Sequence, residues 1–542
     1  MTMNKKHVLL LSTIMLIIFS AIVGCSFSSA GDDRASEVTF VESWDFASGF
    51  HPINTLAVST NHGPAAYMPN FYETLVNYKD GEFVPGLAES WDISADGQVY
   101  TFYLKENVKF SDGTRFDAEA VKKNLEVIPI MLGDYNGTMG RVTTLLDQIV
   151  VMDPYTVEVH LTSPYYGALK DFTMPNPMAM VSPNGLESDG AMSEEWKTTT
   201  FGTGPYMYEG ETDGTTYTFI KNPYYWGEDP QVEKFHIKVI PDNDTKLLAL
   251  RNGEIDMIVG AKHVSHDGFN EMKAVAGFEA IISEAVSSTR TLGFNVTKAP
   301  FDELDVRLAA SYAIDKLGIS SSIFSGVEPK ADSIFDPSMP YTDVNLTPYE
   351  YDKEKAKELL ENAGWVDSDG DGVREKNGVR LEGEILYMTG QAMIDDLILA
   401  LATQLNEIGM AIKPNGMERM AYYSKIQQNE FTIAFNETYG IIYDPYTYIS
   451  NMNPDHMMDN FAALGLSFVE NSNEIINALN VSVDEEEIQE TYSFILTEIH
   501  EKAIFLPISY MKELAVYNSA KIEEYTFYSY PSFIDVTAIT LK

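Results

Sequence analysis

Patterns typical of strands and of helices alternate along this chain from about residue 38 to its end. Residues 155–164 (YTVEVHLTSP) place apolar and polar side chains at alternate positions, as a half-buried strand does. Residues 117–128 (DAEAVKKNLEVI) begin at an aspartate cap and then carry apolar residues at helical spacing. Residues 242–260 predict a capped helix followed by a short buried strand, and residues 351–365 predict an amphipathic helix ended by Gly364. This alternation predicts α/β lobes.

Length and charge restrict the class of protein. A chain of 542 residues is too long for one small core, so we expect two or more lobes. Apolar residues make up 45% of the chain and aromatic residues 12%, which is typical of a packed globular protein. The formal net charge is −43, so nucleic acid and anionic membrane surfaces are poor partners. The acidity fits a solvated extracytoplasmic or halotolerant surface, or cationic ligands.

The first 24 residues have the pattern of a secretory signal. Lys5 and Lys6 precede the apolar run VLLLSTIMLIIFSAIVG (8–24), and Cys25, the only cysteine, follows. The ending IVGC resembles the lipobox of prokaryotic lipoproteins, which implies that Cys25 is diacylated and becomes the mature N-terminus. The alternative is an uncleaved membrane anchor. Residues 25–37 are small and polar, as in a flexible tether, so we expect a body held at the extracytoplasmic face of the membrane.

Enzyme signatures are missing from the sequence. It has no Gly-x-Ser-x-Gly elbow and no glycine-rich phosphate loop. Residues 500–504 (HEKAI) begin like a zinc-protease helix, but Ile504 stands where the second histidine belongs. One cysteine also excludes a disulfide framework and a thiolate zinc site. We therefore expect a protein that is not an enzyme and needs no cofactor.

Several longer segments carry a resemblance to known proteins: FYETLV (71–76), 84–121, GTGPY (202–206), NPYYWG (222–227), 240–257, 294–315, 355–365 and FLPISY (505–510). In order and spacing, they resemble the substrate-binding proteins of ABC importers for peptides and nickel, bacterial solute-binding family 5. The resemblance implies an α/β, two-lobed periplasmic-binding-protein-like fold (type II, cluster C) with a hinge and a ligand cleft between the lobes. It implies lobe I at roughly 38–285 with 510–542, and lobe II at roughly 286–509.

One stretch, NETYGIIYDPYTYISNM (436–452), is followed by Pro454, Asp455 and His456. It resembles the cleft of the nickel-binding members of that family. The resemblance implies that His456 coordinates the metal and that Tyr439 and Tyr443 pack against a small organic chelator. Imidazole suits nickel, copper and zinc, and a single protein ligand needs a chelator to complete the coordination shell. The alternative is that His456 is a solvated loop residue.

The other wall of the cleft departs from the family pattern. Nickel-binding members hold the chelator carboxylates with arginines of lobe I, whereas here Asn176 takes one of these positions and Arg141 is the only cation near the other. A charge-assisted hydrogen bond is about twice as strong as a neutral one, so the chelator is different, less anionic, or held by Arg141 alone. Met139 lies in the same stretch, and its thioether can either ligate a soft metal or fill apolar space. The same alternatives apply to Met174, Met178, Met180, Met457 and Met458.

Other histidines are candidates for further metal ligands. His62 falls in the first cleft-lining loop of the family and is a candidate second metal ligand from lobe I, whereas His51 is expected to shape that loop. His263 and His266 are three residues apart, a spacing that can bind a metal, but a surface turn is the simpler interpretation.

An acidic turn gives a second candidate ion site. Asp367, Asp369 and Asp371 alternate as in the first half of a calcium loop, with Glu375 at the ninth position and Gly378 at the twelfth. The residues predict a structural Ca²⁺ site or, alternatively, an acidic hairpin turn without an ion.

Together these features predict a lipid-anchored receptor that captures nickel, or a similar divalent metal, as a small chelate. Its expected partners are the permease and ATPase subunits of an ABC importer, and the receptor itself is expected to be a monomer. The alternative is an oligopeptide or dipeptide receptor with the same fold. No residue supports a surface adhesin or a purely structural lipoprotein.

Overall fold

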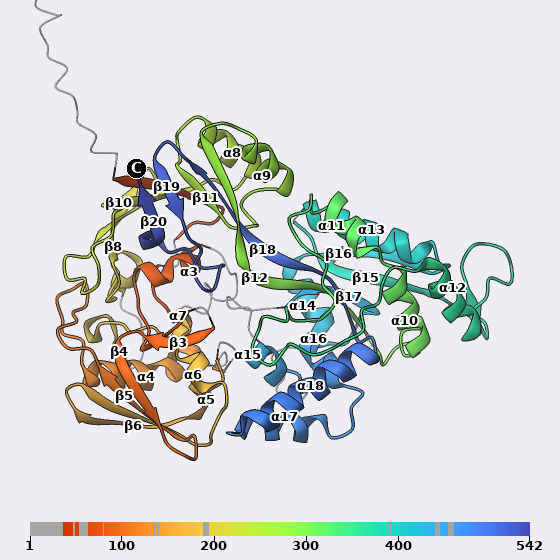
Figure 1. Ribbon diagram of the computed structural model, residues 1–542, viewed down its shortest axis with the longest axis horizontal. Helices are drawn as coiled ribbons and strands as arrows, with labels where there is room; N and C mark the ends of the chain where they lie inside the picture. Colours follow the sequence, from red (N-terminus) through yellow and green to blue (C-terminus); the bar gives the residue numbers. More distant parts are fainter. Residues whose placement is uncertain are drawn as a thin grey trace, which may run out of the picture.

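The structure is a computed structural model, and the residues it describes are 36–46, 49–53, 63–79, 81–133, 136–137, 140–187, 194–390, 392–438, 445–453 and 460–542. They form two lobes, joined by the long antiparallel strands β12 (Phe278–Phe294) and β18 (Phe505–Asn518) (Figure 1). We keep the names lobe I and lobe II for the ranges given above. No helix in the described part of the chain has the length and apolar character needed to span a membrane.

Lobe I contains two four-stranded sheets. The first has the order β1 (Glu37–Glu42), β10 (Lys234–Val239), β9 (Thr216–Lys221), β8 (Tyr206–Thr212). The second has the order β4 (Ala88–Ile93), β5 (Val99–Leu104), β7 (Thr156–Leu161), β6 (Leu146–Asp153). The helices and short strands around them are α3 (Pro64–Tyr67), η1 (Met68–Asn70), β2 (Val76–Lys79), β3 (Glu82–Pro85), α4 (Ala118–Leu132), α5 (Val142–Leu145), α6 (Ala168–Asp171), α7 (Pro175–Met178), η3 (Pro183–Gly185), η4 (Glu194–Lys197), α8 (Asn243–Arg251), α9 (His266–Lys273), β19 (Ile522–Tyr525), η6 (Val536–Ala538) and β20 (Ile539–Leu541).

Lobe II is built on the far part of a six-stranded sheet that both lobes share. Its order is β11 (Met257–Val259), β18, β12, β17 (Ile433–Glu437), β15 (Glu382–Met388), β16 (Ala411–Met417). The remaining elements of lobe II are α10 (Leu304–Ala313), α11 (Lys316–Ser322), α12 (Lys353–Asn362), β13 (Glu375–Lys376), β14 (Val379–Arg380), α13 (Ala392–Asn406), α14 (Arg419–Gln427), α15 (Pro445–Ser450), α16 (Asn460–Ala463), η5 (Leu464–Leu466), α17 (Ser472–Val481) and α18 (Glu485–Glu501).

Local sequence signals explain where the predicted elements begin and end. The Asp117 carboxylate accepts a hydrogen bond from the Ala120 amide at 3.1 Å and caps α4, as predicted. The Asp242 carboxylate caps α8 in the same way, and the strand that follows, β11, is buried along its length. Helix α12 ends just before Gly364, whose φ of +87° suits glycine. These three sequence predictions are confirmed.

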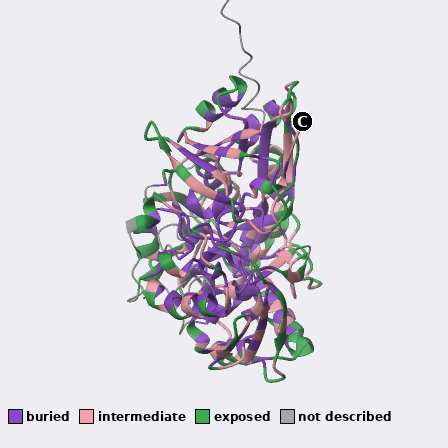
Figure 2. Ribbon diagram, turned by 90° about the vertical axis from the view of Figure 1, so that its left-hand side faces the viewer, coloured by how far each residue is buried: buried purple, intermediate pink, exposed green. Residues whose placement is uncertain are grey.

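Each lobe has its own buried core, and the connecting strands contribute to several of them. Side chains between Val38 and Ile237 pack with the C-terminal segment from Ile522 to Ile539 in one cluster of lobe I. Two further clusters belong to lobe II, and the ends of β12 and β18 enter them. Buried residues fill the interior, while exposed residues lie mainly on the outer helices and turns (Figure 2). The strands that join the lobes are therefore anchored on both sides.

Candidate ligand cleft

Described residues lie on both sides of the segment 439–444 in the predicted metal-binding stretch. Before it, Thr438 pairs with β12: its Oγ1 accepts from the Thr289 amide at 2.8 Å, and its amide donates to the Thr289 carbonyl at 2.9 Å. After it, the Tyr446 ring in α15 packs against the Tyr166 ring of lobe I, with 5.1 Å between centroids. Thr438 thus contacts a connecting strand, and Tyr446 contacts the opposite lobe.

Several of the site residues predicted from sequence fall outside the described residues. These are His456, His62, Tyr439, Tyr443, Met139 and Cys25, and Met457 and Met458 fall there as well. Their roles therefore stay predictions. Arg141, Asn176 and the acidic turn lie within the described part of the chain.

Arg141 immediately precedes α5 in lobe I. The following amide, that of Val142, donates to Asp171 Oδ2 at 2.8 Å, which ties this turn to α6. Gly140 has a φ of +133°, which favours glycine, and a Cβ atom there would lie 3.1 Å from the Asp171 carboxyl carbon. The Arg141 guanidinium lies 5.9 Å from the Tyr165 ring centroid. The predicted anion-binding charge thus lies beside Tyr165, whose ring meets that of Tyr166 edge-on at 5.5 Å.

Asn176 is a buried amide with an unused donor. Its side chain is 3% exposed, and its Nδ2 has no hydrogen-bond partner among the described residues. It sits in α7 with extended backbone dihedrals (φ −111°, ψ 113°). A buried donor without a partner costs about 1–3 kcal/mol, a cost that a ligand acceptor can remove. Among the nearby methionines, Met178 and Met180 are buried in the core of lobe I, as the packing interpretation predicted.

A buried ion cluster lies where β12, β17 and β18 meet. The Arg290 guanidinium, 1% exposed, donates to both oxygens of Glu328, with Nε 2.9 Å from Oε2. It also pairs with Glu437 of β17, and Lys262 from lobe I lies 3.7 Å from the other Glu437 oxygen. The cluster thus links groups from the two lobes beside the connecting strands.

The histidine pair predicted at a surface turn is buried instead. The His263 ring contacts Ser43 Oγ through Nδ1 at 3.1 Å and Glu42 through Nε2 at 3.2 Å. His266 is the first residue of α9, and its ring lies beside Glu328 and Phe324. The surface-turn prediction is wrong because α9 packs this segment onto the shared sheet, and the two rings face different partners rather than one metal.

His51 is also buried. Its ring meets the edge of Trp196 at 4.8 Å, and neither ring nitrogen has a hydrogen-bond partner among the described residues. Burial lowers the pKa of the His51 imidazole to about 3, so the ring is neutral near pH 7.

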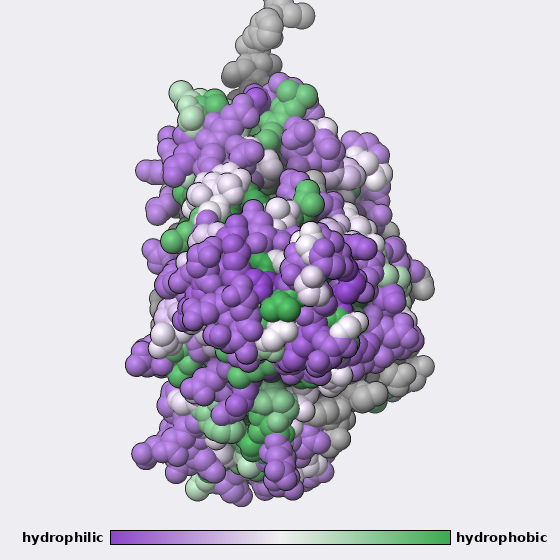
Figure 3. Space-filling model, turned by 90° about the vertical axis from the view of Figure 1, so that its right-hand side faces the viewer, coloured by the Kyte–Doolittle hydropathy of each residue, from purple (hydrophilic) through white to green (hydrophobic). Residues whose placement is uncertain are grey.

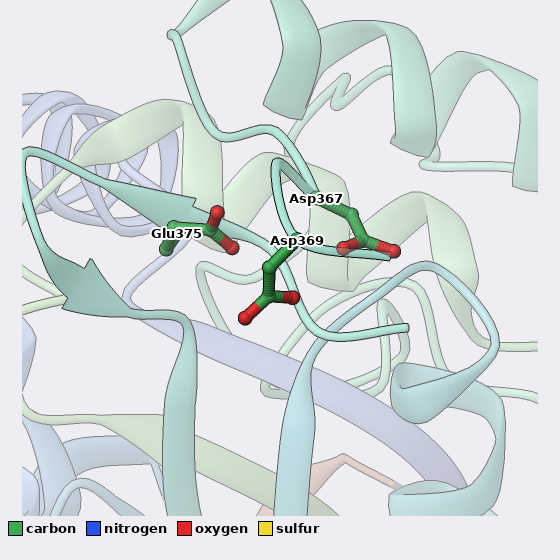
Figure 4. A group of neighbouring side chains, drawn as sticks. All are labelled: Asp367, Asp369 and Glu375. Carbon is green, nitrogen blue, oxygen red and sulfur yellow. The ribbon is translucent and has the colours of Figure 1, made fainter. Parts of the chain in front are cut away.

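The acidic turn brings three of its four predicted ligands together. Oxygens of Asp367, Asp369 and Glu375 lie within 4.8 Å of one another, the aspartates on the turn and the glutamate on the strand that follows (Figure 4). Asp371 instead pairs with Arg380 at 2.8 Å. Asp367 already accepts from the Gly370 and Gly372 amides at 2.7 and 3.0 Å, as in a turn without an ion. Calcium at this turn stays a prediction, and its candidate ligands are reduced to three.

Sequence reasoning did not identify the tyrosines that join the lobes. Tyr166 meets Tyr341, Tyr446 and Tyr492, which come from three separate segments of lobe II. The chain has 31 tyrosines, and Tyr166, Tyr341 and Tyr492 stand in no recognisable local motif. Only Tyr446 lay in the tyrosine-rich stretch already considered.

Comparison with known proteins finds relatives along most of the chain. The family described as "Bacterial extracellular solute-binding proteins, family 5 Middle" matches residues 82–458. The nickel-binding periplasmic protein of Escherichia coli K12 is 32% identical over 512 residues, which cover 94% of this chain and 95% of that protein. Glutathione-binding protein GsiB of Salmonella paratyphi A is 29% identical over 345 residues, 63% of this chain and 65% of its own. The structure of NikA from Brucella suis in complex with Fe(III)-EDTA has a TM-score of 0.85 at 31% identity, covering 93% of this chain and 100% of that chain.

Proposed function

The chain belongs to family 5 of the bacterial extracellular solute-binding proteins, and from this premise we propose that it captures nickel, or a similar divalent metal, as a small organic chelate. It is a substrate-binding protein of the ABC-importer class and not an enzyme, as the sequence predicted. The observation that carries the proposal is the extent of the similarity to a nickel-binding protein. That alignment covers 94% of this chain at 32% identity, whereas the alignment with the glutathione-binding relative covers 63% of it.

The chemistry of the cleft supports a chelate better than a bare ion. His456 supplies one imidazole nitrogen, and the chelator supplies most of the remaining ligands. Arg141 supplies a positive charge for a chelator carboxylate, and the unused Asn176 donor supplies an uncharged hydrogen bond. Tyr439 and Tyr443 pack against the organic part of the ligand. His62 is the candidate second metal ligand.

Binding draws the two lobes together about β12 and β18, and the closed form is the one that the permease recognises. The closed cleft excludes water, which strengthens the few polar contacts to the ligand. Diacylation of Cys25 holds the receptor at the extracytoplasmic face. Cys25→Ser should therefore move the protein from the membrane fraction to the soluble fraction of its host.

Calorimetry with nickel tests the proposal. Ni²⁺ added with L-histidine should give saturable binding to the purified protein, whereas Ni²⁺ alone should bind much more weakly. His456→Ala should abolish the chelate binding, because one imidazole is the main protein contact to the metal. His160→Ala is a matched control, since His160 pairs with Glu158 in β7 of lobe I, outside the cleft.

A peptide receptor is the second candidate, and the glutathione-binding relatives favour a short peptide. Tight binding of glutathione or of a dipeptide mixture without any metal, together with no response to nickel and histidine, would contradict the metal proposal. The same outcome would support the peptide alternative.

A further inference from the structure

Described residues of the two lobes meet on two sides of the connecting strands. On one side, α9 of lobe I contacts the loop that follows α11 of lobe II. The Asn270 side-chain amide donates to the Ser325 carbonyl at 3.1 Å, and Ser325 Oγ donates to Asp267 at 2.7 Å. On the other side, the contact is built around Tyr166 of lobe I. In Figure 1, α9 lies above β12 and β18, whereas α15, α17 and α18 lie next to α5 and α6 below these strands.

The second contact is a cluster of four tyrosine rings, Tyr166, Tyr341, Tyr446 and Tyr492, which we call the tyrosine seam. The Tyr166 hydroxyl is 2.9 Å from the Tyr492 hydroxyl in α18, and the Tyr166 ring lies 5.1 Å from the Tyr446 ring in α15. The Tyr341 ring lies 5.8 and 5.1 Å from the rings of Tyr446 and Tyr492. The Tyr166 amide also donates to the Asn480 carbonyl of α17 at 3.4 Å. One residue of lobe I thus contacts four segments of lobe II.

Tyr166 belongs to the packing of both lobes. Its side chain contacts the core of lobe I and also the lobe II cluster that contains Tyr492. Tyr446 is 6% exposed, and Tyr492 is fully buried. Aromatic pairs stabilise a contact beyond the area they bury, and a buried tyrosine hydroxyl requires hydrogen-bond partners. Separation of the lobes at the seam therefore removes a hydrogen bond and brings ring surface into contact with water.

Rotation about the connecting strands affects the two contacts differently. Helix α9 packs directly on β12 and β18, so a rotation about these strands moves its contact with Ser325 little. In Figure 1 the tyrosine seam lies away from these strands, so the same rotation separates its two sides. The tyrosine seam is therefore the contact that breaks when the lobes open.

A close approach of two turns accompanies the tyrosine seam. Gly97 lies in the turn between β4 and β5 of lobe I, and Val483 lies between α17 and α18 of lobe II. A Cβ atom on Gly97 would lie 2.8 Å from Val483 Cγ1 and 3.2 Å from Pro164, two residues before Tyr166. In a disulfide, the Cβ of one cysteine lies about 3 Å from the sulfur of the other. A cysteine pair at positions 97 and 483 therefore reports that the lobes are together.

We propose that the tyrosine seam is a conformational latch, in which Tyr166 of lobe I holds the two lobes in contact before any ligand binds. Every group in the seam belongs to this chain, so the contact forms without a ligand. The inference goes beyond the proposed function, because it holds whichever solute the protein binds. A latch that increases the closed fraction increases, by the same factor, the apparent affinity for a ligand that binds the closed form.

Disulfide trapping without added metal or chelator tests the latch. The parent protein carries Gly97→Cys, Val483→Cys and Cys25→Ser, so the introduced pair are its only thiols. Diamide oxidises the two thiols to a disulfide and is itself reduced, and the rate of crosslinking follows the fraction of molecules in which the lobes are together. Addition of Tyr166→Ala should slow crosslinking at least about tenfold, because the ring contacts and the hydrogen bond are lost together.

Two further variants separate the latch from a general loss of stability. Tyr166→Phe keeps the ring and removes the hydroxyl, so its crosslinking rate should lie between those of the parent and Tyr166→Ala. Tyr312→Ala removes a tyrosine that pairs with Tyr349 inside lobe II at 5.3 Å, and it should keep the rate of the parent. Circular dichroism of each variant checks that the fold is retained.

Small-angle X-ray scattering gives a second measurement that needs no introduced cysteine. Tyr166→Ala should have a larger radius of gyration than wild type, because its lobes separate more often. Equal crosslinking rates in the parent and in Tyr166→Ala, with equal radii of gyration, would overturn the latch. A parent protein that does not crosslink would overturn it as well, because its lobes are then apart without a ligand.

The latch and the proposed function fail independently. The trapping and scattering experiments contain no nickel, so a negative result in both leaves the proposed metal binding standing. Absence of nickel binding in calorimetry overturns the proposed function and leaves the latch standing, because the seam contains no ligand contact.

Discussion

Glu73 illustrates how burial changes a single residue of this acidic chain. It lines a cavity of about 130 Å³ in lobe I together with Asp535, Tyr225 and Tyr528. The Trp226 indole donates to Glu73 Oε2 at 2.7 Å. Burial raises the pKa of the Glu73 carboxyl to about 7 and also raises the pKa of Asp535. Two carboxyls of the same cavity thus favour their neutral forms.

We expect wild type to lose stability relative to Glu73→Gln as the pH rises from 5 to 7. A carboxyl with a raised pKa in the folded state keeps its proton there after the unfolded chain has lost it, so the free energy of unfolding falls with pH. The window runs from the ordinary value of 4.5 to about 7. The loss should be on the order of 2 kcal/mol, since one pKa unit corresponds to about 1.4 kcal/mol.

Urea denaturation of both proteins at pH 5 and pH 7 measures this difference. Glu228→Gln is the matched control, because Glu228 is an exposed residue close to Trp226 in the sequence. Equal pH dependence in wild type and Glu73→Gln would contradict the expectation.

At the scale of elements, β12 depends on one buried ion pair. Arg290 of this strand binds Glu328, whose side chain is fully buried, and Ser509 of β18 donates to the same carboxylate at 2.6 Å. Such a pair is hard to break on one side, because the remaining charge has neither water nor a partner. The pair therefore holds the connecting strands to lobe II in one arrangement.

Arg290→Met should lower the free energy of unfolding by about 3–5 kcal/mol, because it leaves the Glu328 carboxylate buried without its counter-charge. The double variant Arg290→Met with Glu328→Gln should recover a large part of that loss, since no charge then remains buried. Chemical denaturation of the wild type and of the three variants, including Glu328→Gln alone, gives the coupling free energy between the Arg290 and Glu328 side chains. Additive losses would show that the two side chains act independently.

The acidic turn before β13 gives a second expectation at this scale. If Ca²⁺ binds Asp367, Asp369 and Glu375, about 1 mM Ca²⁺ should raise the midpoint of thermal unfolding above that in EGTA. Asp369→Asn should remove the rise, and Asp371→Asn should keep it, because Asp371 pairs with Arg380 instead. Equal midpoints of the wild type in both buffers would show that the turn needs no ion.

The whole molecule carries a large negative charge on its surface. The net charge is −43, and hydrophilic side chains cover most of the face drawn in Figure 3, with apolar side chains in small separate patches. Repulsion between like charges destabilises a compact state and is screened by salt. The acidity is therefore a property of the whole surface.

Thermal unfolding near pH 7 should shift to higher temperature when NaCl increases from about 0.01 M to about 1 M, because the Debye length falls from about 30 Å to about 3 Å. The shift should shrink at pH 5, closer to the isoelectric point near 4.4, because the net charge is then much smaller. Scanning calorimetry at both pH values measures the two shifts. A shift of equal size at pH 5 would assign the effect to general salt exclusion rather than to repulsion.

Local patterns predicted much of the fold and only part of the site. The capped starts of α4 and α8, the buried strand β11 and the end of α12 at Gly364 follow from side chains within a few residues. The buried positions of His263 and His266 do not, because their partners Glu42 and Glu328 lie far away in the sequence. His456 and its neighbours depend on resemblance to a family rather than on a contact of this chain.

The sequence by itself determined the α/β class, the family and the residue types available to a ligand. Periodicity, caps and ordered motifs each depend on residues that are close together in the sequence. Only the tertiary structure decided that Tyr166 meets Tyr492, 326 residues later, and that Arg290 meets Glu437, 147 residues later. The neighbouring residues in the sequence do not signal such pairs, because their proximity arises from two strands that run between the lobes. These distant contacts fix how the two lobes meet.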